Sequence, residues 1–149
     1  MNAEQIAAVQ STFEKVHPLS DITAEMFYNR LFELDPSVQS LFKGDMKEQG
    51  RKLMHMISLA VSRLNRLETL VPAVQALGTR HVDYGVKHAH YDTVGAALLW
   101  TLEQGLSGDL TPEVKEAWDE AYHLLTGIMK EAAVAVHRSH PLSWALSPT

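Results

Sequence analysis

His81 stands near the end of a predicted helix, and its side chain is suited to binding a metal. A neutral imidazole binds a metal through one ring nitrogen, and its other ring N–H then needs an acceptor that fixes the tautomer. On a helix, the carbonyl of Leu77 lies one turn back and can accept that hydrogen bond. Taken alone, however, a histidine near a helix end is more often a surface or capping residue.

Tyr28 and Gln49 are upstream side chains that can donate hydrogen bonds. Gln49 lies 32 residues before His81, and Leu53 follows Gln49 by one helical turn on the same face. A phenol and an amide can both donate to a ligand with partial negative charge, each bond contributing about 1 kcal/mol net and more where water is excluded. The alternatives are a core aromatic residue with a solvated hydroxyl for Tyr28 and an exposed helix residue for Gln49.

The composition bounds the class of protein. A chain of 149 residues with 46% hydrophobic residues is typical of one globular domain with one core. The absence of cysteine excludes disulfides, thiolate zinc sites and iron–sulfur clusters. A net charge of −5 argues against non-specific binding to nucleic acid or anionic membranes. Because no secretory signal and no apolar stretch of roughly 18 residues occurs, a cytoplasmic protein is predicted.

The chain is predicted to be all-α, because apolar residues recur at three- and four-residue spacings and no segment alternates with period two for long. The first helix is predicted over residues 6–16. The second has Ser20 or Asp21 as its N-terminal cap and ends at the break Asp35-Pro36, and a short helical turn follows at 37–42. The remaining helices are predicted over 46–65, 68–82, 90–105 and 112–137. Thr111 is predicted to cap the last helix, and Gly85 to end the fourth. Residues 1–138 form one predicted domain, and 139–149 a flexible tail.

Four segments, in this order, resemble the globin family. They are Met26-Phe27-Tyr28-Asn29-Arg30-Leu31-Phe32-Glu33-Leu34-Asp35-Pro36, Leu41-Phe42, Arg51-Lys52-Leu53-Met54 and Leu77-Gly78-Thr79-Arg80-His81. The resemblance covers about residues 6–134 and is closest to bacterial single-domain globins and the globin part of flavohaemoglobins, with neuroglobin-like chains less close. It implies a globin fold, with about six main helices packed in crossed pairs around haem b.

The resemblance also implies roles for single residues. His81 becomes the axial iron ligand, with Tyr28 and Gln49 on the opposite, distal side. Phe42 is expected to stack on the porphyrin. The other implied haem contacts are Leu53, Ile57, Val94 and Leu98 in the cavity, and Arg80, with Lys52 and His88, near the propionates. The alternative for the cavity residues is ordinary core packing, which requires the same apolar residues as a haem pocket does. The alternative for the cations is that they are solvated surface side chains.

The distal position carries glutamine, which is not a usual iron ligand. The nearest histidine on that helix, His55, lies six residues beyond Gln49, about 240° around the helix. We therefore expect a ferrous iron that is five-coordinate or weakly six-coordinate and open to gases. Coordination of ferric iron by tyrosine is the alternative.

Tyr91 is the implied partner of the ligand histidine. In flavohaemoglobin-like globins, a tyrosine at this offset approaches the imidazole and pairs with a glutamate of the last helix. The matching position here is Ala135, and Glu131, one turn away, is the nearest substitute. A carboxylate behind the histidine favours O–O cleavage, so its loss predicts weak peroxidase-like activity. Tyr91 fits equally well as a packing residue.

The resemblance implies reversible binding of dioxygen, nitric oxide and carbon monoxide by a monomer or homodimer. Two distal donors suit tight retention of dioxygen and hence oxygen-dependent conversion of nitric oxide to nitrate. Because the chain ends before any reductase domain, turnover would need an external reductase. The alternatives are a gas- or redox-sensing globin that signals to a partner and a haem-free helical interaction module.

Overall fold

The computed structural model describes the backbone of residues 1–139 and the side chains of that range except those of residue 83 and residues 136–139. The described range holds six α-helices and no strand, which confirms the predicted all-α class. The helices are α1 (Ala3–Val16), α2 (Ser20–Leu34), α3 (Met46–Ser62), α4 (Val71–Asp83), α5 (His88–Leu106) and α6 (Pro112–Ser139). Short 3-10 segments lie at His17–Leu19, Pro36–Leu41, Leu64–Thr69 and Ser107–Asp109. Residues 140–149, most of the predicted tail, lie outside the described range.

Two of the predicted helix ends are confirmed. The hydroxyl of Thr111 accepts a hydrogen bond from the N–H of Val114 at 3.3 Å, and Pro112 is the first residue of α6. After α4, Gly85 adopts a φ of 85°, a conformation that glycine takes without the steric cost borne by other residues. Both signals are local, which explains why the sequence alone locates them.

Three predicted boundaries are wrong. Neither Ser20 nor Asp21 caps α2, because the 3-10 segment His17–Leu19 runs directly into that helix and the Ser20 hydroxyl donates to the His17 carbonyl instead. The third helix ends at Ser62 rather than at residue 65, and the fourth begins at Val71 rather than at residue 68. The 3-10 segment Leu64–Thr69 separates them, and within it Arg66 has non-helical backbone angles.

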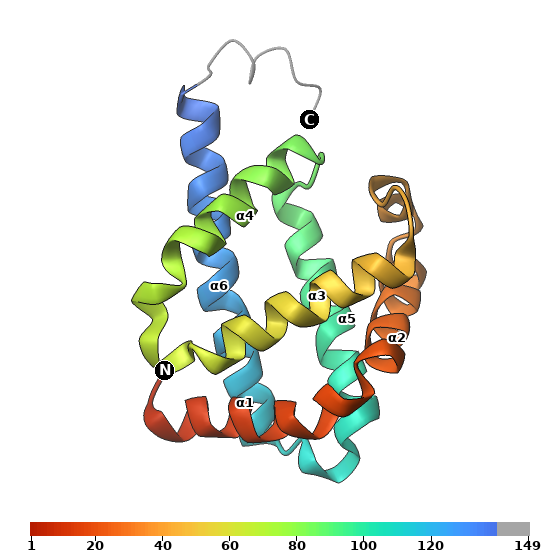
Figure 1. Ribbon diagram of the computed structural model, residues 1–149, viewed down its shortest axis with the longest axis vertical. Helices are drawn as coiled ribbons and strands as arrows, with labels where there is room; N and C mark the ends of the chain where they lie inside the picture. The colour runs from red at the N-terminus through yellow and green to blue at the C-terminus, as the bar shows by residue number, and fades with distance from the viewer. Residues whose placement is uncertain (140–149) are drawn as a thin grey trace.

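The helices pack in crossed pairs, as predicted. In Figure 1, α4 passes across α6, and α1 lies across the other end of α6. α2 packs against both α3 and α5. Within the described residues, α3 and α4 do not pack against each other along their lengths, since α3 is held by α2 and α4 by α6. No helix of residues 1–139 has a stretch long and apolar enough to cross a membrane.

Gly78 permits the close approach of α4 to α6. A Cβ atom at Gly78 would lie 2.5 Å from the carbonyl oxygen and 2.7 Å from the Cα of Met129. Both are backbone atoms, so they cannot give way as the end of a side chain can. Any side chain at residue 78 would therefore push the two helices apart.

Gly78→Ala is expected to destabilise the fold by about 1–3 kcal/mol, the usual cost of overpacking. Gly127→Ala is the matched control, because a Cβ at Gly127 of α6 meets open space. That change should be neutral or stabilise the protein by up to about 1 kcal/mol through helix propensity. Denaturant unfolding followed by circular dichroism measures both, and equal effects would contradict the close approach.

Candidate functional site

His81 lies in the last turn of α4 with its imidazole partly buried. Its Nδ1 is 2.7 Å from the carbonyl oxygen of Leu77, which confirms the predicted hydrogen bond. Because a carbonyl only accepts, Nδ1 carries the proton and Nε2 keeps its lone pair. The imidazole is therefore held in the tautomer that can bind a metal through Nε2.

The charge state of His81 also suits a metal ligand. Burial lowers the pKa of His81 from its ordinary 6.5, because the charged imidazolium loses hydration. The hydrogen bond to Leu77 opposes this shift in pKa, and the nearby positive charge of Arg80 adds to it. The imidazole is thus neutral at pH 7, the form that coordinates metals.

The turn after α4 brings distant parts of the chain together. The N–H of Val86 donates to the carbonyl of His81 at 2.9 Å and closes the end of the helix. A Cβ atom at Gly85 would lie 3.6 Å from the side chain of Leu41, so this turn lies beside the segment Pro36–Leu41. The end of α4 therefore adjoins the segment that leads into Phe42.

Tyr91 of α5 lies beside His81. The two ring centroids are 6.4 Å apart, and the ring planes meet at 57°. α6 supports Tyr91 in two ways, since the Tyr122 hydroxyl donates to the Tyr91 carbonyl and the Lys130 ammonium lies 5.6 Å from the Tyr91 ring centre. Burial raises the pKa of Tyr91, which favours its neutral phenol.

Glu131 does not take the place of the expected glutamate. It is exposed, and within residues 1–139 no hydrogen bond joins it to Tyr91. Successive residues of a helix are rotated by about 100°, so Glu131 turns away where Lys130 faces the ring. The α6 side chain that lies at the Tyr91 ring is therefore the cation Lys130. Glu131 does not act through Tyr91 as an electron-donating carboxylate for His81.

Tyr28 of α2 is surrounded by aromatic rings and is only 8% exposed. Its ring centroid lies 5.2 Å from that of Phe42 and 6.1 Å from that of Phe32. Its hydroxyl is 3.4 Å from the Gln49 carbonyl oxygen, beyond the usual range of roughly 2.5–3.0 Å, so this bond is weak and the hydroxyl can turn to another acceptor. Burial raises the pKa of Tyr28 to about 12, which keeps the phenol protonated and able to donate.

Gln49 and Leu53 lie on one face of α3, close to Tyr28. Asp45 positions the start of this helix, because its side chain accepts a hydrogen bond from the N–H of Lys47 at 2.9 Å. Gln49 is half-buried, and its side-chain amide makes no hydrogen bond to any described residue. That amide is thus a donor without a partner among the described residues, on the residue whose backbone carbonyl the Tyr28 hydroxyl contacts.

Most of the predicted cavity residues surround Tyr28. We call this apolar group the α2–α5 cluster; its buried members are Phe27, Tyr28, Leu31, Val38 and Ala97. Phe42, Leu53, Val94 and Leu98 pack against this cluster. Ile57 instead packs against the neighbouring core of α1, α3, α5 and α6, and Leu98 contacts both groups. The structure therefore brings four of the five predicted apolar contacts to the cluster that contains Tyr28 and places Ile57 against the other core cluster.

The predicted propionate partners are surface residues. Arg80 is exposed and forms no ion pair within the described residues. Lys52 forms an exposed ion pair with Glu48 at 3.9 Å. His88 is exposed, and the Nδ1 of His90 caps α5 by accepting from the N–H of Lys87. Of these cations Arg80 is the one whose charge acts on His81. No three metal-binding side chains gather within the described residues.

Sequence reasoning missed Phe32, Tyr122 and Lys130. Phe32 follows Tyr28 by one helical turn, so its place on the same face of α2 was open to prediction. Tyr122 and Lys130 reach Tyr91 only because α6 crosses α5 at that point. No local signal in the sequence reports that crossing.

The donor set fits haem. A neutral imidazole with a free Nε2 is the usual proximal ligand of globin-type haem. α3, which carries the amide of Gln49, does not pack against α4, which carries His81, within the described residues. The apolar α2–α5 cluster suits a porphyrin face, and its only polar group near the site is the protonated phenol of Tyr28.

The comparison with known sequences supports the same family. The globin family model matches residues 25–129. An uncharacterized globin-like protein of Aquifex aeolicus is 36% identical over 127 residues, which cover 84% of this chain and 88% of that protein. The flavohemoprotein of Bacillus subtilis is 25% identical over 141 residues, which cover 93% of this chain but only 34% of the flavohemoprotein. The chain therefore spans about a third of the length of the flavohemoproteins that it matches.

Two solved structures share the fold. One is an engineered carbene transferase made from a putative nitric oxide dioxygenase of Rhodothermus marinus, with a TM-score of 0.84 and 22% identity over 93% of this chain and 97% of that chain. The other is a bacterial globin of Campylobacter jejuni, with a TM-score of 0.80 and 24% identity over 92% and 99% of the two chains. These likenesses confirm the predicted globin fold. Since the family model also matches well over half of the sequence, the chain belongs to the globin family, whose members bind haem.

Proposed function

We propose that this protein binds haem b through Nε2 of His81 and reversibly binds dioxygen, nitric oxide and carbon monoxide. The observation that carries the proposal is the neutral, Nδ1-protonated imidazole of His81 on α4, and the buried, protonated phenol of Tyr28 on α2 is the proposed donor to the gas. Haem, when bound, supplies an iron centre for diatomic gases. The chain itself holds the imidazole, excludes water and places the donors.

The apolar side chains keep water away from the site. Phe42, Leu53, Val94 and Leu98 pack against one cluster, and such a dry lining strengthens any hydrogen bond made within it. Arg80, one residue before the ligand and unpaired within the described residues, is the cation proposed to meet a propionate.

Tyr28 and Gln49 are proposed to retain dioxygen. The phenol is held to the Gln49 carbonyl by a single weak hydrogen bond, so little is lost when it turns to a gas ligand. The Gln49 amide is a second donor with no partner among the described residues. Because about 1.4 kcal/mol changes a rate tenfold, two donors are expected to slow the escape of dioxygen by more than about tenfold.

We further propose conversion of nitric oxide to nitrate with a separate reductase. Nitric oxide, dioxygen and one electron give nitrate, so both oxygen atoms of dioxygen are consumed and the electron comes from the reductase. Slow escape of dioxygen favours this reaction, because nitric oxide then meets a loaded site. One protein with the same fold is described as a putative nitric oxide dioxygenase, and this chain matches about a third of the length of the flavohemoproteins, which is consistent with the proposal.

The proposal is tested by mixing the haem-loaded protein with dioxygen, nitric oxide, a reductase and its nicotinamide cofactor. Nitrate is expected to exceed the haem concentration several-fold, and Tyr28→Phe should lower the yield. One nitrate per haem or less would reduce the function to gas binding. A purified chain that shows no Soret absorption band after haem addition would overturn haem binding itself.

A further inference from the structure

Two cavities meet at Met54 of α3, away from the hydrogen-bonding face of Gln49. The inner cavity has a volume of about 10 Å³, and the outer pocket has a volume of about 230 Å³. Met54 is the one residue that lines both of them. Ile57 lines the inner cavity and its chain neighbour Ser58 lines the outer pocket, so the two spaces lie on different faces of α3.

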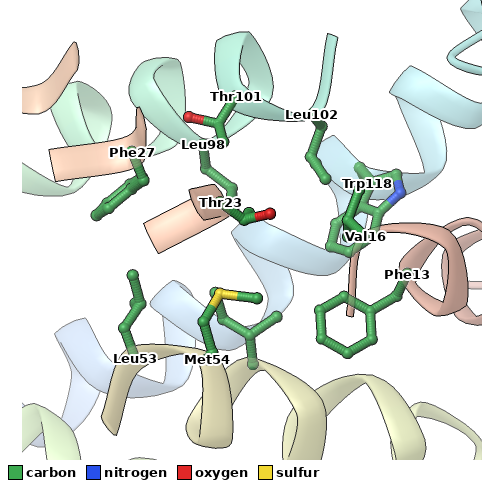
Figure 2. A pocket seen from close by; sticks show the side chains of 11 residues that line it. Phe13, Val16, Thr23, Phe27, Leu53, Met54, Leu98, Thr101, Leu102 and Trp118 are labelled. Carbon is green, nitrogen blue, oxygen red and sulfur yellow. The ribbon is translucent and has the colours of Figure 1, made fainter. Parts of the chain in front are cut away.

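The inner cavity is apolar and adjoins the candidate haem site. Leu53, Phe27 and Leu98 line it, and the same three side chains belong to or pack against the α2–α5 cluster around Tyr28. Figure 2 shows Leu53 and Met54 reaching up from α3 toward Phe27 and Leu98. The Thr101 hydroxyl on its wall is already bonded to the Ala97 carbonyl at 2.8 Å. Such a space offers water no polar partners, and at about 10 Å³ it must widen to admit a diatomic gas.

The outer pocket is polar and open to solvent. Its lining combines residues of the 3-10 segment His17–Leu19, the start of α2 and the outer face of α3; they are His17, Ser20, Asp21, Arg51, His55 and Ser58, with Met54 as the apolar member. Its charged side chains form no ion pairs with any described residue. The pocket is thus a hydrated entrance whose apolar wall is the Met54 side chain.

Met54 is suited to being a movable wall. It is 5% exposed, so it separates the two spaces in the closed arrangement. Its unbranched side chain has three rotatable bonds and a thioether that forms no strong hydrogen bond. A rotamer change at Met54 breaks no hydrogen bond, whereas the rings of Phe13, Phe27 and Trp118, which line the same cavity, are rigid.

We infer that diatomic gases enter through the outer pocket, pass Met54 into the inner cavity and reach the haem site past Leu53. The inference rests on the proposed function, because the route leads to a bound haem. The competing entrance is at Gln49, at the start of α3. There the closely packed rings of Tyr28, Phe32 and Phe42 and a polar amide line the way, which is a poorer path for an apolar gas.

The test is carbon monoxide rebinding to the haem-loaded protein after flash photolysis. Met54→Trp, which fills the junction, is expected to slow bimolecular association about tenfold, equivalent to about 1.4 kcal/mol in the barrier. Met54→Ala, which opens the junction, is expected to speed it several-fold, so the proposal does not depend on the tryptophan variant folding. Ser62→Trp is the control, because Ser62 is an exposed residue of the same helix, lines neither cavity and lies about 220° around the helix from Gln49.

The outcomes separate the route from the proposed function. Changed rates in both Met54 variants, with an unchanged carbon monoxide spectrum and an unaffected Ser62→Trp, would support the route. Rates within twofold of the parent for both Met54 variants would overturn it. Failure of the unaltered protein to form a carbon monoxide complex would overturn the proposed function, and the route with it.

Discussion

His81→Ala is expected to abolish tight haem binding while leaving the helical fold in place. The change removes the one candidate axial ligand, among the side chains that the structure describes, whose tautomer, charge state and partial burial all suit a metal. Alanine is a good helix former, and the His81 side chain makes one local hydrogen bond, so the cost to the fold should be small. Since loss of a residue that merely orients a ligand lowers metal affinity by about 10–100-fold, loss of the ligand itself should exceed about 100-fold. Haem titration followed by the Soret band measures this.

His123→Ala is a close control for His81→Ala. The Nδ1 of His123 is 2.8 Å from the carbonyl of Asp119, one turn back on α6, which reproduces the local arrangement of His81 on an exposed helix face. Haem affinity should therefore not change in this variant. In His81→Gly, added imidazole should restore the Soret band by replacing the missing ligand. Equal haem affinity in His81→Ala and the parent would refute the assignment.

Tyr28→Phe is expected to speed dioxygen dissociation about tenfold or more, because it removes one donor from a dry site where about 1.4 kcal/mol corresponds to tenfold. The ring keeps its contacts with Phe32 and Phe42, so the pocket shape should persist. Carbon monoxide dissociation should change much less, because bound carbon monoxide carries less partial negative charge than bound dioxygen and is therefore a weaker hydrogen-bond acceptor. Stopped-flow displacement of each gas gives both rates.

Tyr84→Phe is the control for a general effect of losing a phenol near the haem. The Tyr84 ring lies 6.0 Å from that of His81, but Tyr84 is 58% exposed. Its loss should leave dioxygen dissociation unaltered. If dioxygen leaves the parent and Tyr28→Phe at the same rate, the phenol does not hold the gas.

The pH dependence of the same rate tests the environment of Tyr28. An ordinary phenol with a pKa of about 10 is half ionised at pH 10, whereas a pKa of about 12 leaves only about 1% ionised there. Ionisation removes the donor, so dioxygen dissociation should stay slow through pH 10 and accelerate only at higher pH. A rise centred on pH 10 would contradict the burial of this side chain.

Local features of the site were open to prediction from the sequence. The bond from His81 to Leu77 joins residues one turn apart, the Thr111 cap precedes Pro112, and the turn at Gly85 needs a glycine. Each depends on a few neighbouring residues, so helical periodicity and capping chemistry suffice. The ligand, donor and lining roles remain predictions for the experiments above.

Other features depend on how the helices cross. Lys130 rather than Glu131 faces Tyr91 because of the rotation of α6 at its contact with α5. The 3-10 segment Leu64–Thr69 replaces the ends of two predicted helices, although the apolar spacing there continues to favour helix. In both cases residues distant in the sequence select among locally acceptable arrangements.

The sequence by itself determined the helical class, the order of the main helices and the turn that presents His81, because these follow from interactions within about one helical turn. Only the tertiary structure decided that Gly78 must admit the Met129 backbone, that Tyr28 meets the Gln49 carbonyl, and that Met54 divides two cavities. Those contacts depend on the distances and rotations of crossing helices. Packing across the whole core sets these at once, and no short segment encodes them.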